Sequence, residues 1–151
     1  MTAMRVYIDA DGCPVVRQTV RLCCQFGVPC TIVCDTSHEF SFPDVETVVC
    51  GKGADSADFA LLRRIGPGDL AVTQDYGLAA LVLSRGAQAI NQDGLRYTQE
   101  NIDALLTFRA ASARIRAGGG RLRGPSRRTP VQDAAFVRQL EQLLHREETT
   151  P

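Results

Sequence analysis

The sequence predicts an α/β fold: a three-layer α/β/α sandwich with a mostly parallel, about five-stranded sheet and additional C-terminal helices. The prediction rests on short apolar runs that suit strands and on the helical segments that separate them. Short apolar runs rich in valine and isoleucine alternate with segments of about ten residues whose apolar positions have helical spacing. Because strands joined through helices form parallel sheets with right-handed crossovers, we expect one continuous sheet. At 151 residues the chain is expected to be one domain, residues 1–151.

The first ninety residues carry this alternation. Residues 5–9 predict a strand because Val6, Tyr7 and Ile8 suit a buried strand. Pro14 fits the first turn of a helix over 14–26, which ends at Gly27. Further strands are predicted at 30–34, 46–50, 70–73 and 87–91, and further helices at 55–65 and 76–85.

The last third of the chain is predicted to be helical. Apolar stripes over 98–117 and 131–144 are expected to pack both helices on the sheet. The stripe residues are Ile102, Leu105, Leu106, Phe108 and Ala113 in the first helix and Phe136, Val137, Leu140, Leu143 and Leu144 in the second. Residues 118–130 are rich in glycine and arginine and poor in apolar residues, so we expect a mobile loop there.

Composition excludes several classes of protein. The 17 basic and 17 acidic residues give no net charge, and no apolar run is long enough to cross a bilayer. None of the six cysteines stands in a C-x-x-C pair, so their spacing indicates free thiols in a reducing compartment rather than a zinc site. We therefore expect a cytoplasmic protein with no membrane partner.

Acidic residues stand where predicted strands end and predicted helices begin. Asp9 and Asp11 follow the first strand, and Asp75 follows the strand at 70–73. Asp55 and Asp58 lie three residues apart at a helix start. The structural alternative is local pairing for Asp9 and a role as helix cap or first-turn residue for the other four. In a parallel sheet, however, these positions face one edge, and carboxylates gathered there favour a hard cation, Mg²⁺ or Mn²⁺.

Several segments, in order along the chain, resemble the bacterial YaiI/YqxD family, which in turn resembles PIN-like nuclease domains. They are Ile-Asp-Ala-Asp-Gly-Cys-Pro-Val at 8–15, Asp-x-x-Asp at 55–58, Gly-Asp-Leu-Ala-Val-Thr-x-Asp at 68–75 and Gly-x-Arg-Tyr-Thr at 94–98. The resemblance implies a single PIN-like domain. In it, Asp9, Asp75 and one helix acid, Asp58 or Asp55, would bind metal for RNA cleavage. Asp11 belongs to the family's own motif rather than to the general PIN pattern.

We therefore expect a metal-dependent ribonuclease. Asp9, Asp58 and Asp75 are its predicted catalytic residues, and Asp11 and Asp55 complete the predicted metal site. Two alternatives stay open. One is a phosphatase similar to the haloacid dehalogenases, because Asp-x-Asp-Gly stands at 9–12. The other is a non-catalytic RNA-binding module whose acids serve only as caps.

Arginines in the C-terminal third favour RNA as the partner. Residues 104–132 contain seven arginines and no acid, a pattern that suits a phosphate backbone. The predicted nucleic-acid-binding residues are Arg121, Arg123, Arg127 and Arg128, all within or beside the expected loop. A solvated helix face followed by a loop is the structural alternative.

Overall fold

All five strands that the structure describes run in the same direction. The computed structural model describes residues 3–35, 40, 42–51, 56–119 and 127–149. Its strands are β1 (Val6–Asp9), β2 (Cys30–Asp35), β3 (Glu46–Cys50), β4 (Leu70–Val72) and β5 (Gln88–Ile90). They form one sheet in the order β3-β2-β1-β4-β5, and each adjacent pair is parallel. The predicted α/β class and the number of strands are confirmed.

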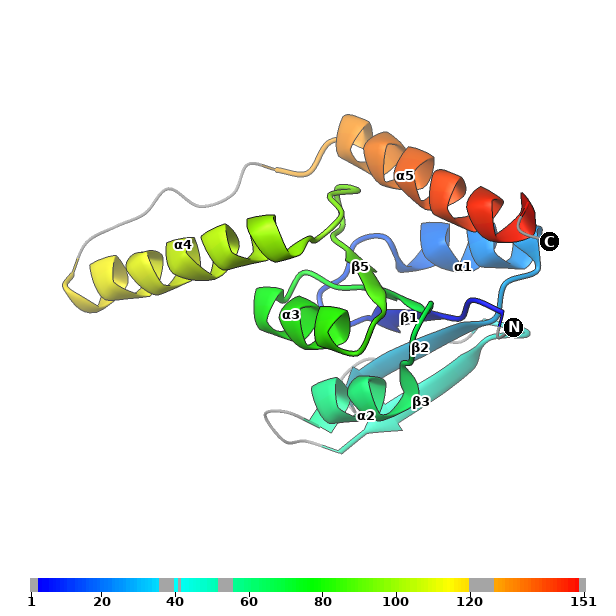
Figure 1. Cartoon of the computed structure of the whole chain (residues 1–151), viewed down its shortest axis with the longest axis horizontal. Coiled ribbons are helices and arrows are strands. Elements are labelled where there is room, and N and C mark those ends of the chain that lie inside the picture. Colours follow the sequence, from blue (N-terminus) through cyan, green and yellow to red (C-terminus); the bar gives the residue numbers. More distant parts are fainter. Residues whose placement is uncertain (1–2, 36–39, 41, 52–55, 120–126, 150–151) are drawn as a thin grey trace.

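Helices cover both faces of this sheet (Figure 1). α1 (Val16–Phe26) and α5 (Pro130–Thr149) lie on one face, and α2 (Ser56–Arg64) and α3 (Tyr76–Ser84) lie on the other. α4 (Gln99–Ala117) packs against α3. This is the predicted three-layer sandwich. Within the described ranges, no helix combines the length and the apolar content that crossing a bilayer requires.

Alternating side chains of β1, β2, β4 and β5 belong to two separate cores, one on each face of the sheet. Val6 and Ile8 of β1 pack with Phe136 of α5 on one face of the sheet. Tyr7, between them, packs with Leu61 of α2 on the other face. Because both faces are buried, the strands appear in the sequence as nearly continuous apolar runs, which is why pattern alone located them.

Most element boundaries lie within two residues of the prediction, and two differences affect the argument. β2 continues to Asp35, so this carboxylate ends a strand. α5 runs on to Thr149, and its predicted stripe is confirmed, since Phe136, Leu140, Leu143 and Leu144 are buried. Of the expected loop at 118–130, residues 120–126 lie outside the part of the chain that the structure describes.

The expected packing of α4 on the sheet is wrong. Of its predicted stripe, Ile102 is buried and Leu105 and Leu106 are partly buried against α3; in the second half of the helix Ser112, which is not a stripe residue, is buried. Phe108 is 65% exposed, and the stripe ends there. The physical reason is that α2 and α3 already cover this face of the sheet, so α4 packs on α3 and then extends beyond the body of the molecule (Figure 1).

The turn between β5 and α4 packs tightly against α5. Asn91 Oδ1 accepts hydrogen bonds from the backbone N–H groups of Asp93 (2.9 Å) and Leu95 (2.8 Å), which shape the turn. Gly94 has a φ of +86°, and a Cβ added to it would lie 2.8 Å from the carbonyl oxygen of Ala135 in α5. Glycine is therefore required both by the backbone conformation and by the approach of α5.

We expect Gly94→Ala to lower the free energy of unfolding by more than about 2 kcal/mol, because left-handed strain adds to a clash with backbone atoms. Gly27→Ala is the matched control: Gly27 has a φ of +69°, but nothing lies within 4 Å of its added Cβ. That variant should lose only the strain, about 1 kcal/mol. Urea unfolding of both variants measures the difference. Equal losses would contradict the tight packing of this turn.

Candidate functional site

A pocket of about 690 Å³ opens at the carboxyl edge of the sheet. Its lining residues come from the ends of β1, β2 and β4, the starts of α2 and α3, and the middle of α4. They are Asp9, Asp11, Gly12, Asp35, Ala57, Asp58, Gln74, Asp75, Tyr76 and Arg109. Five of these ten are aspartates, and Arg109 is the one cation among the described residues that line the pocket. Asp9, Asp11, Asp58 and Asp75 thus meet at one site, whereas Asp55 lies outside the described residues.

Asp9 is held in a fixed position at the end of β1. The Thr73 hydroxyl donates a hydrogen bond of 2.7 Å to Asp9 Oδ2. Burial is the main cause that raises the pKa of Asp9 from 3.8 to about 6, and the charges of Asp58, Asp75 and Asp11 also raise it, while the Thr73 hydrogen bond opposes the rise. The ionised form of Asp9 is therefore unfavourable here, and a cation would stabilise it.

Asp75 is both a helix cap and a pocket residue. As the N-cap of α3, its Oδ1 accepts from the backbone N–H groups of Gly77 (2.9 Å) and Leu78 (3.1 Å), which confirms the cap interpretation. The Asp75 N–H donates to Thr73 Oγ1 at 3.0 Å. One threonine hydroxyl therefore joins Asp9 on β1 to Asp75 after β4.

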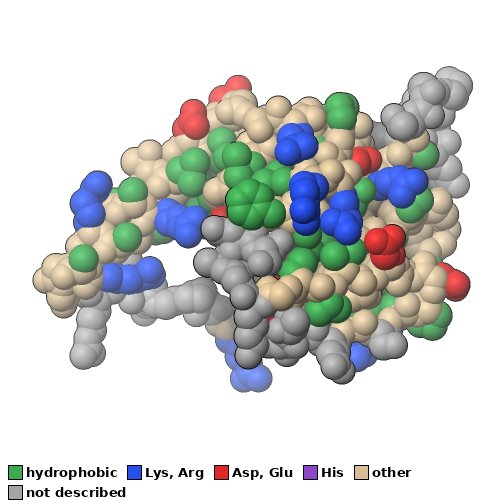
Figure 2. Space-filling view, turned by 90° about the horizontal axis from the view of Figure 1, so that it is seen from below, with side chains coloured by type: hydrophobic (Ala, Val, Ile, Leu, Met, Phe, Trp, Pro, Cys, Tyr) green, Lys and Arg blue, Asp and Glu red, His purple; other side chains and the backbone are tan. Residues whose placement is uncertain are grey.

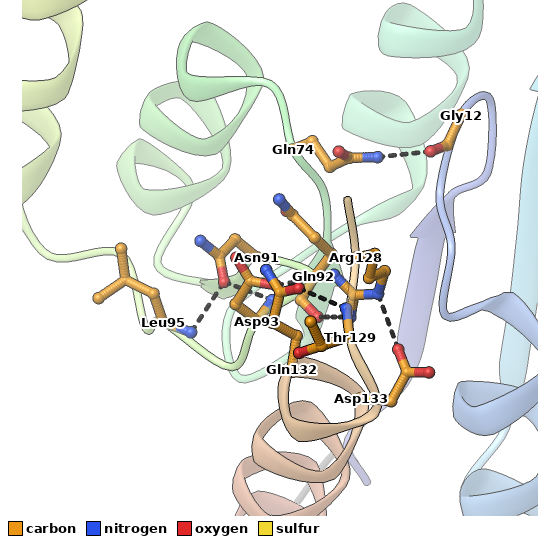
Figure 3. Close-up of polar contacts among 10 residues, drawn as sticks. All are labelled: Gly12, Gln74, Asn91, Gln92, Asp93, Leu95, Arg128, Thr129, Gln132 and Asp133. Carbon is orange, nitrogen blue, oxygen red and sulfur yellow. Dashed lines mark hydrogen bonds and ion pairs between the residues drawn. The ribbon is translucent and has the colours of Figure 1, made fainter. Parts of the chain in front are cut away.

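The loop that follows β4 has two further restraints. The buried Tyr97 hydroxyl donates to the carbonyl oxygen of Thr73 at 3.1 Å. Gln74 Nε2 donates to the carbonyl oxygen of Gly12 at 2.7 Å, which ties this loop to the turn after β1 (Figure 3). The backbone that carries the Thr73 hydroxyl is thus held by Tyr97 at Thr73 itself and by Gly12 through the next residue, Gln74.

Asp11 connects the ends of two strands. Its carboxylate oxygens accept from the backbone N–H of Asp35 at 3.3 and 3.2 Å. Asp35 itself lines the pocket, and the sequence interpretation missed it. The signal was available, because Asp35 directly follows an apolar run at the same edge as Asp9. Asp11 therefore has a structural role in addition to its place at the pocket.

The carboxylates do not yet form a ligand set. Among the described residues, no three His, Cys, Asp or Glu side chains are grouped so that they could hold a metal ion as they stand. Because Asp55 lies outside the described residues, the predicted metal site as a whole stays a prediction.

Arg109 reaches the pocket from α4. A capping box fixes the start of this helix: Thr98 Oγ1 accepts from the Asn101 N–H (3.2 Å), and Asn101 Oδ1 accepts from the Thr98 N–H (2.8 Å). Ten residues further on, Arg109 Nη1 lies 3.6 Å from Asp75 Oδ1. The sequence placed Arg109 only within a general arginine stripe, because nothing local shows that α4 passes the pocket.

Arg128 has a different environment from the one expected (Figure 3). Its guanidinium contacts Asp93 Oδ1 and Asp133 Oδ1, both at 2.7 Å, and donates to the Gln92 carbonyl oxygen at 2.6 Å. These contacts bind the turn after β5 to the start of α5, so Arg128 is engaged in the fold. Arg127 is exposed, whereas Arg121 and Arg123 lie outside the described residues, and RNA binding by these three stays a prediction.

Cys13, beside the pocket, is not an activated nucleophile. Burial is the main cause that raises the pKa of its thiol to about 11, and the charge of Asp9 adds to the effect. The thiol is therefore protonated near neutral pH.

Comparisons with known proteins show similarity along nearly the whole chain. The family described as "Uncharacterized BCR, YaiI/YqxD family" matches residues 7–146. A UPF0178 protein of Exiguobacterium sibiricum is 50% identical over 93% of this chain and 96% of the relative. UPF0178 proteins of Clostridium acetobutylicum and Enterococcus faecalis are each 40% identical, over 95% of this chain and over 98% and 99% of the relatives. No solved structure matches the chain significantly, so the PIN-like resemblance stays a prediction.

The raised pKa of Asp9 predicts a pH-dependent stability in metal-free buffer. Since the folded protein binds this proton more tightly than the unfolded chain does, the contribution of Asp9 to stability is most favourable at low pH and falls as the pH rises from 3.8 to about 6. The difference corresponds to about 3 kcal/mol. We therefore expect Asp9→Asn to be more stable than the wild type at pH 7.5 and about equal to it at pH 3, below both pKa values.

Thermal and urea unfolding in the presence of a chelator test this expectation. Asp103→Asn is the control, because Asp103 is exposed on α4 and away from the pocket residues. A stability gap between Asp9→Asn and the wild type that is the same at both pH values would refute the prediction.

The position of Thr73 predicts a change in the same titration. Thr73→Val removes the hydrogen bond that favours the ionised carboxylate, so the pKa of Asp9 should rise above about 6. Thr73→Ser keeps the hydroxyl and should stay close to the wild type. Carboxyl carbon chemical shifts followed by NMR against pH give both values. A pKa of Asp9 that is unchanged in Thr73→Val would show that this hydrogen bond does not act on the carboxylate.

Proposed function

The chain belongs to the YaiI/YqxD family, and we propose that it is a divalent-cation-dependent hydrolase that cleaves the phosphodiester backbone of RNA. Asp9, Asp58 and Asp75 are the proposed catalytic residues. The observation that carries the proposal is the pocket at the carboxyl edge of the sheet, where five aspartates face one space. In parallel α/β sheets this edge is where ligands bind.

The charges of the pocket support a cation rather than a neutral ligand. Asp9 is disfavoured as an anion by burial and by three neighbouring carboxylates. A structure that keeps these charges together gains stability from a bound cation, and oxygen donors alone select a hard ion such as Mg²⁺ or Mn²⁺. Asp9, Asp58 and Asp75 would hold the ion. Asp11 and Asp35 line the same pocket and would complete its surroundings. Asp55, three residues before Asp58 in the sequence, stays a predicted ligand.

Each residue has a defined part in this proposal. Bound Mg²⁺ or Mn²⁺ supplies Lewis acidity to the attacking water and the leaving oxygen. The Thr73 hydroxyl fixes the side chain of Asp9, and the α3 cap fixes that of Asp75, so both carboxylates are oriented before substrate arrives. Asp58, in the first turn of α2, lines the same pocket and completes the triad.

A non-catalytic RNA-binding module is the second candidate. It is favoured by the structural roles of two acids: Asp75 caps α3, and Asp11 binds the backbone of Asp35. The phosphatase alternative has no specific contact in its favour, since the Thr73 hydrogen bond to Asp9 Oδ2 and the place of Asp9 in the pocket fit a metal ligand equally well. Trapping with beryllofluoride that is lost in Asp9→Asn would favour the phosphatase.

We further propose that the protein works in the cytoplasm. Its cysteines are free among the described residues, and Cys23, Cys30 and Cys34 are buried as thiols. Cys24 is an exposed free thiol. An exposed thiol persists most readily in a reducing compartment.

The decisive experiment is cleavage of a short, fluorescein-labelled single-stranded RNA. Cleavage should require Mg²⁺ or Mn²⁺ and stop with chelator. Asp9→Asn and Asp75→Asn should lower the cleavage rate by at least about 100-fold. Substitution of residues that only hydrogen-bond to metal ligands already lowers metal affinity or activity by about 10- to 100-fold. Asparagine also caps helices, so Asp75→Asn should still fold.

Asp103→Asn serves as the control of equal charge change and should cleave like the wild type. Calorimetry with Mn²⁺ should show binding that weakens in both pocket variants. Cleavage that is insensitive to chelator and to both pocket substitutions would exclude the proposed site, and RNA binding without cleavage would favour the second candidate.

A further inference from the structure

Arg109 stands between the acidic pocket and open solvent. Its side chain is 61% exposed, and its contact with Asp75 is a single approach of 3.6 Å. Asp75 Oδ1 already accepts two backbone N–H groups of α3, so it does not depend on the arginine. An exposed ion pair of this kind contributes little, and the guanidinium is available to another anion.

The helix continues the same line of positive charge away from the pocket. Arg116 follows Arg109 by seven residues, so the two side chains leave α4 in nearly the same direction, about 10 Å apart along its axis. Arg116 is exposed, and residues 104–117 contain no acid. Figure 2 shows basic side chains spread over this projecting part of the molecule.

An apolar line runs beside these arginines. Phe108 is 65% exposed and Ile115 is 46% exposed, and both lie about 100° around the helix from the arginine line. A phenylalanine ring beside a row of guanidinium groups suits a nucleotide strand, whose bases stack on aromatic rings while its phosphates pair with arginine. An acidic peptide would use the charges but not the exposed ring.

We propose that α4 guides the nucleic-acid strand at the pocket: Arg109 binds a phosphate next to the bond to be cleaved, Phe108 stacks on the base beside that phosphate, and Arg116 binds a phosphate further along. This inference rests on the proposed function, because it assigns that activity its substrate path. It also moves the nucleic-acid contact from the segment around Arg128, whose guanidinium is engaged by Asp93 and Asp133, to the projecting helix.

Binding, rather than cleavage, tests the path. The Asp9→Asn protein serves as the common background, so that the strand stays intact, and fluorescence anisotropy of a fluorescein-labelled single-stranded RNA is measured at several salt concentrations. Arg109→Gln and Arg116→Gln should each lower the slope of log K against log salt by about 0.7, the loss of one phosphate contact. At 0.1 M salt this corresponds to binding about fivefold weaker.

Two further variants separate the contributions. Arg114→Gln makes the same charge change on the same helix, but Arg114 leaves it about 140° away from Arg109, so its slope should stay near that of the background protein. Phe108→Ala should weaken binding about tenfold without changing the slope, because stacking releases no counterions.

Equal losses in Arg109→Gln, Arg114→Gln and Arg116→Gln would overturn the path, since they would indicate only a diffuse positive field. Undetectable RNA binding by the background protein would overturn it as well. The outcome is independent of the cleavage assay: a wild type that does not cleave, with selective losses in Arg109→Gln and Arg116→Gln, would refute the hydrolase but support the path. A wild type that cleaves, with arginine variants that bind RNA like the background protein, would support the hydrolase but refute the path.

Discussion

The parallel arrangement of the five described strands is the constraint on which the rest of the structure depends. It brings the ends of β1, β2 and β4 to one edge and the starts of α2 and α3 beside them, so side chains far apart in the sequence share a pocket. The same arrangement leaves like charges close together in a partly buried place. Burial first, and the neighbouring carboxylates second, raise the pKa of Asp9, and a bound cation would offset both effects.

The pocket residues also serve the fold. Asp75 caps a helix, Asp11 binds the end of β2, and the Thr73 hydroxyl connects two strand ends. Cap and ligand interpretations of such residues are therefore compatible, because a cap fixes one side of a carboxylate and leaves the other directed at solvent. Rigid carboxylates of this kind give a site its geometry before any ligand arrives.

Sequence patterns were sufficient where the physics is local. Buried strands show as apolar runs, so the sheet and the positions of Asp9 and Asp75 at its edge could be predicted. Asp35 was missed because β2 extends one residue past its apolar run. Arg109 and Arg128 depend on contacts with residues 34 and 35 positions away, Asp75 and Asp93, and no local pattern encodes such pairs. The packing of α4 was wrongly predicted because an apolar stripe does not reveal which layer is already covered.

The capping box at the start of α4 fixes where the helix begins, and the direction of the helix from there determines the position of Arg109. Arg109 lies ten residues beyond Gln99, the first residue of the helix, which corresponds to about 15 Å of helix. A change of about 10° in the direction of the helix at Thr98 would therefore displace Arg109 by about 3 Å, which is comparable to the length of its contact with Asp75. The contacts of Ile102, Leu105 and Leu106 with α3 oppose such a rotation, so the packing between these two helices determines where the charge of Arg109 lies at the pocket.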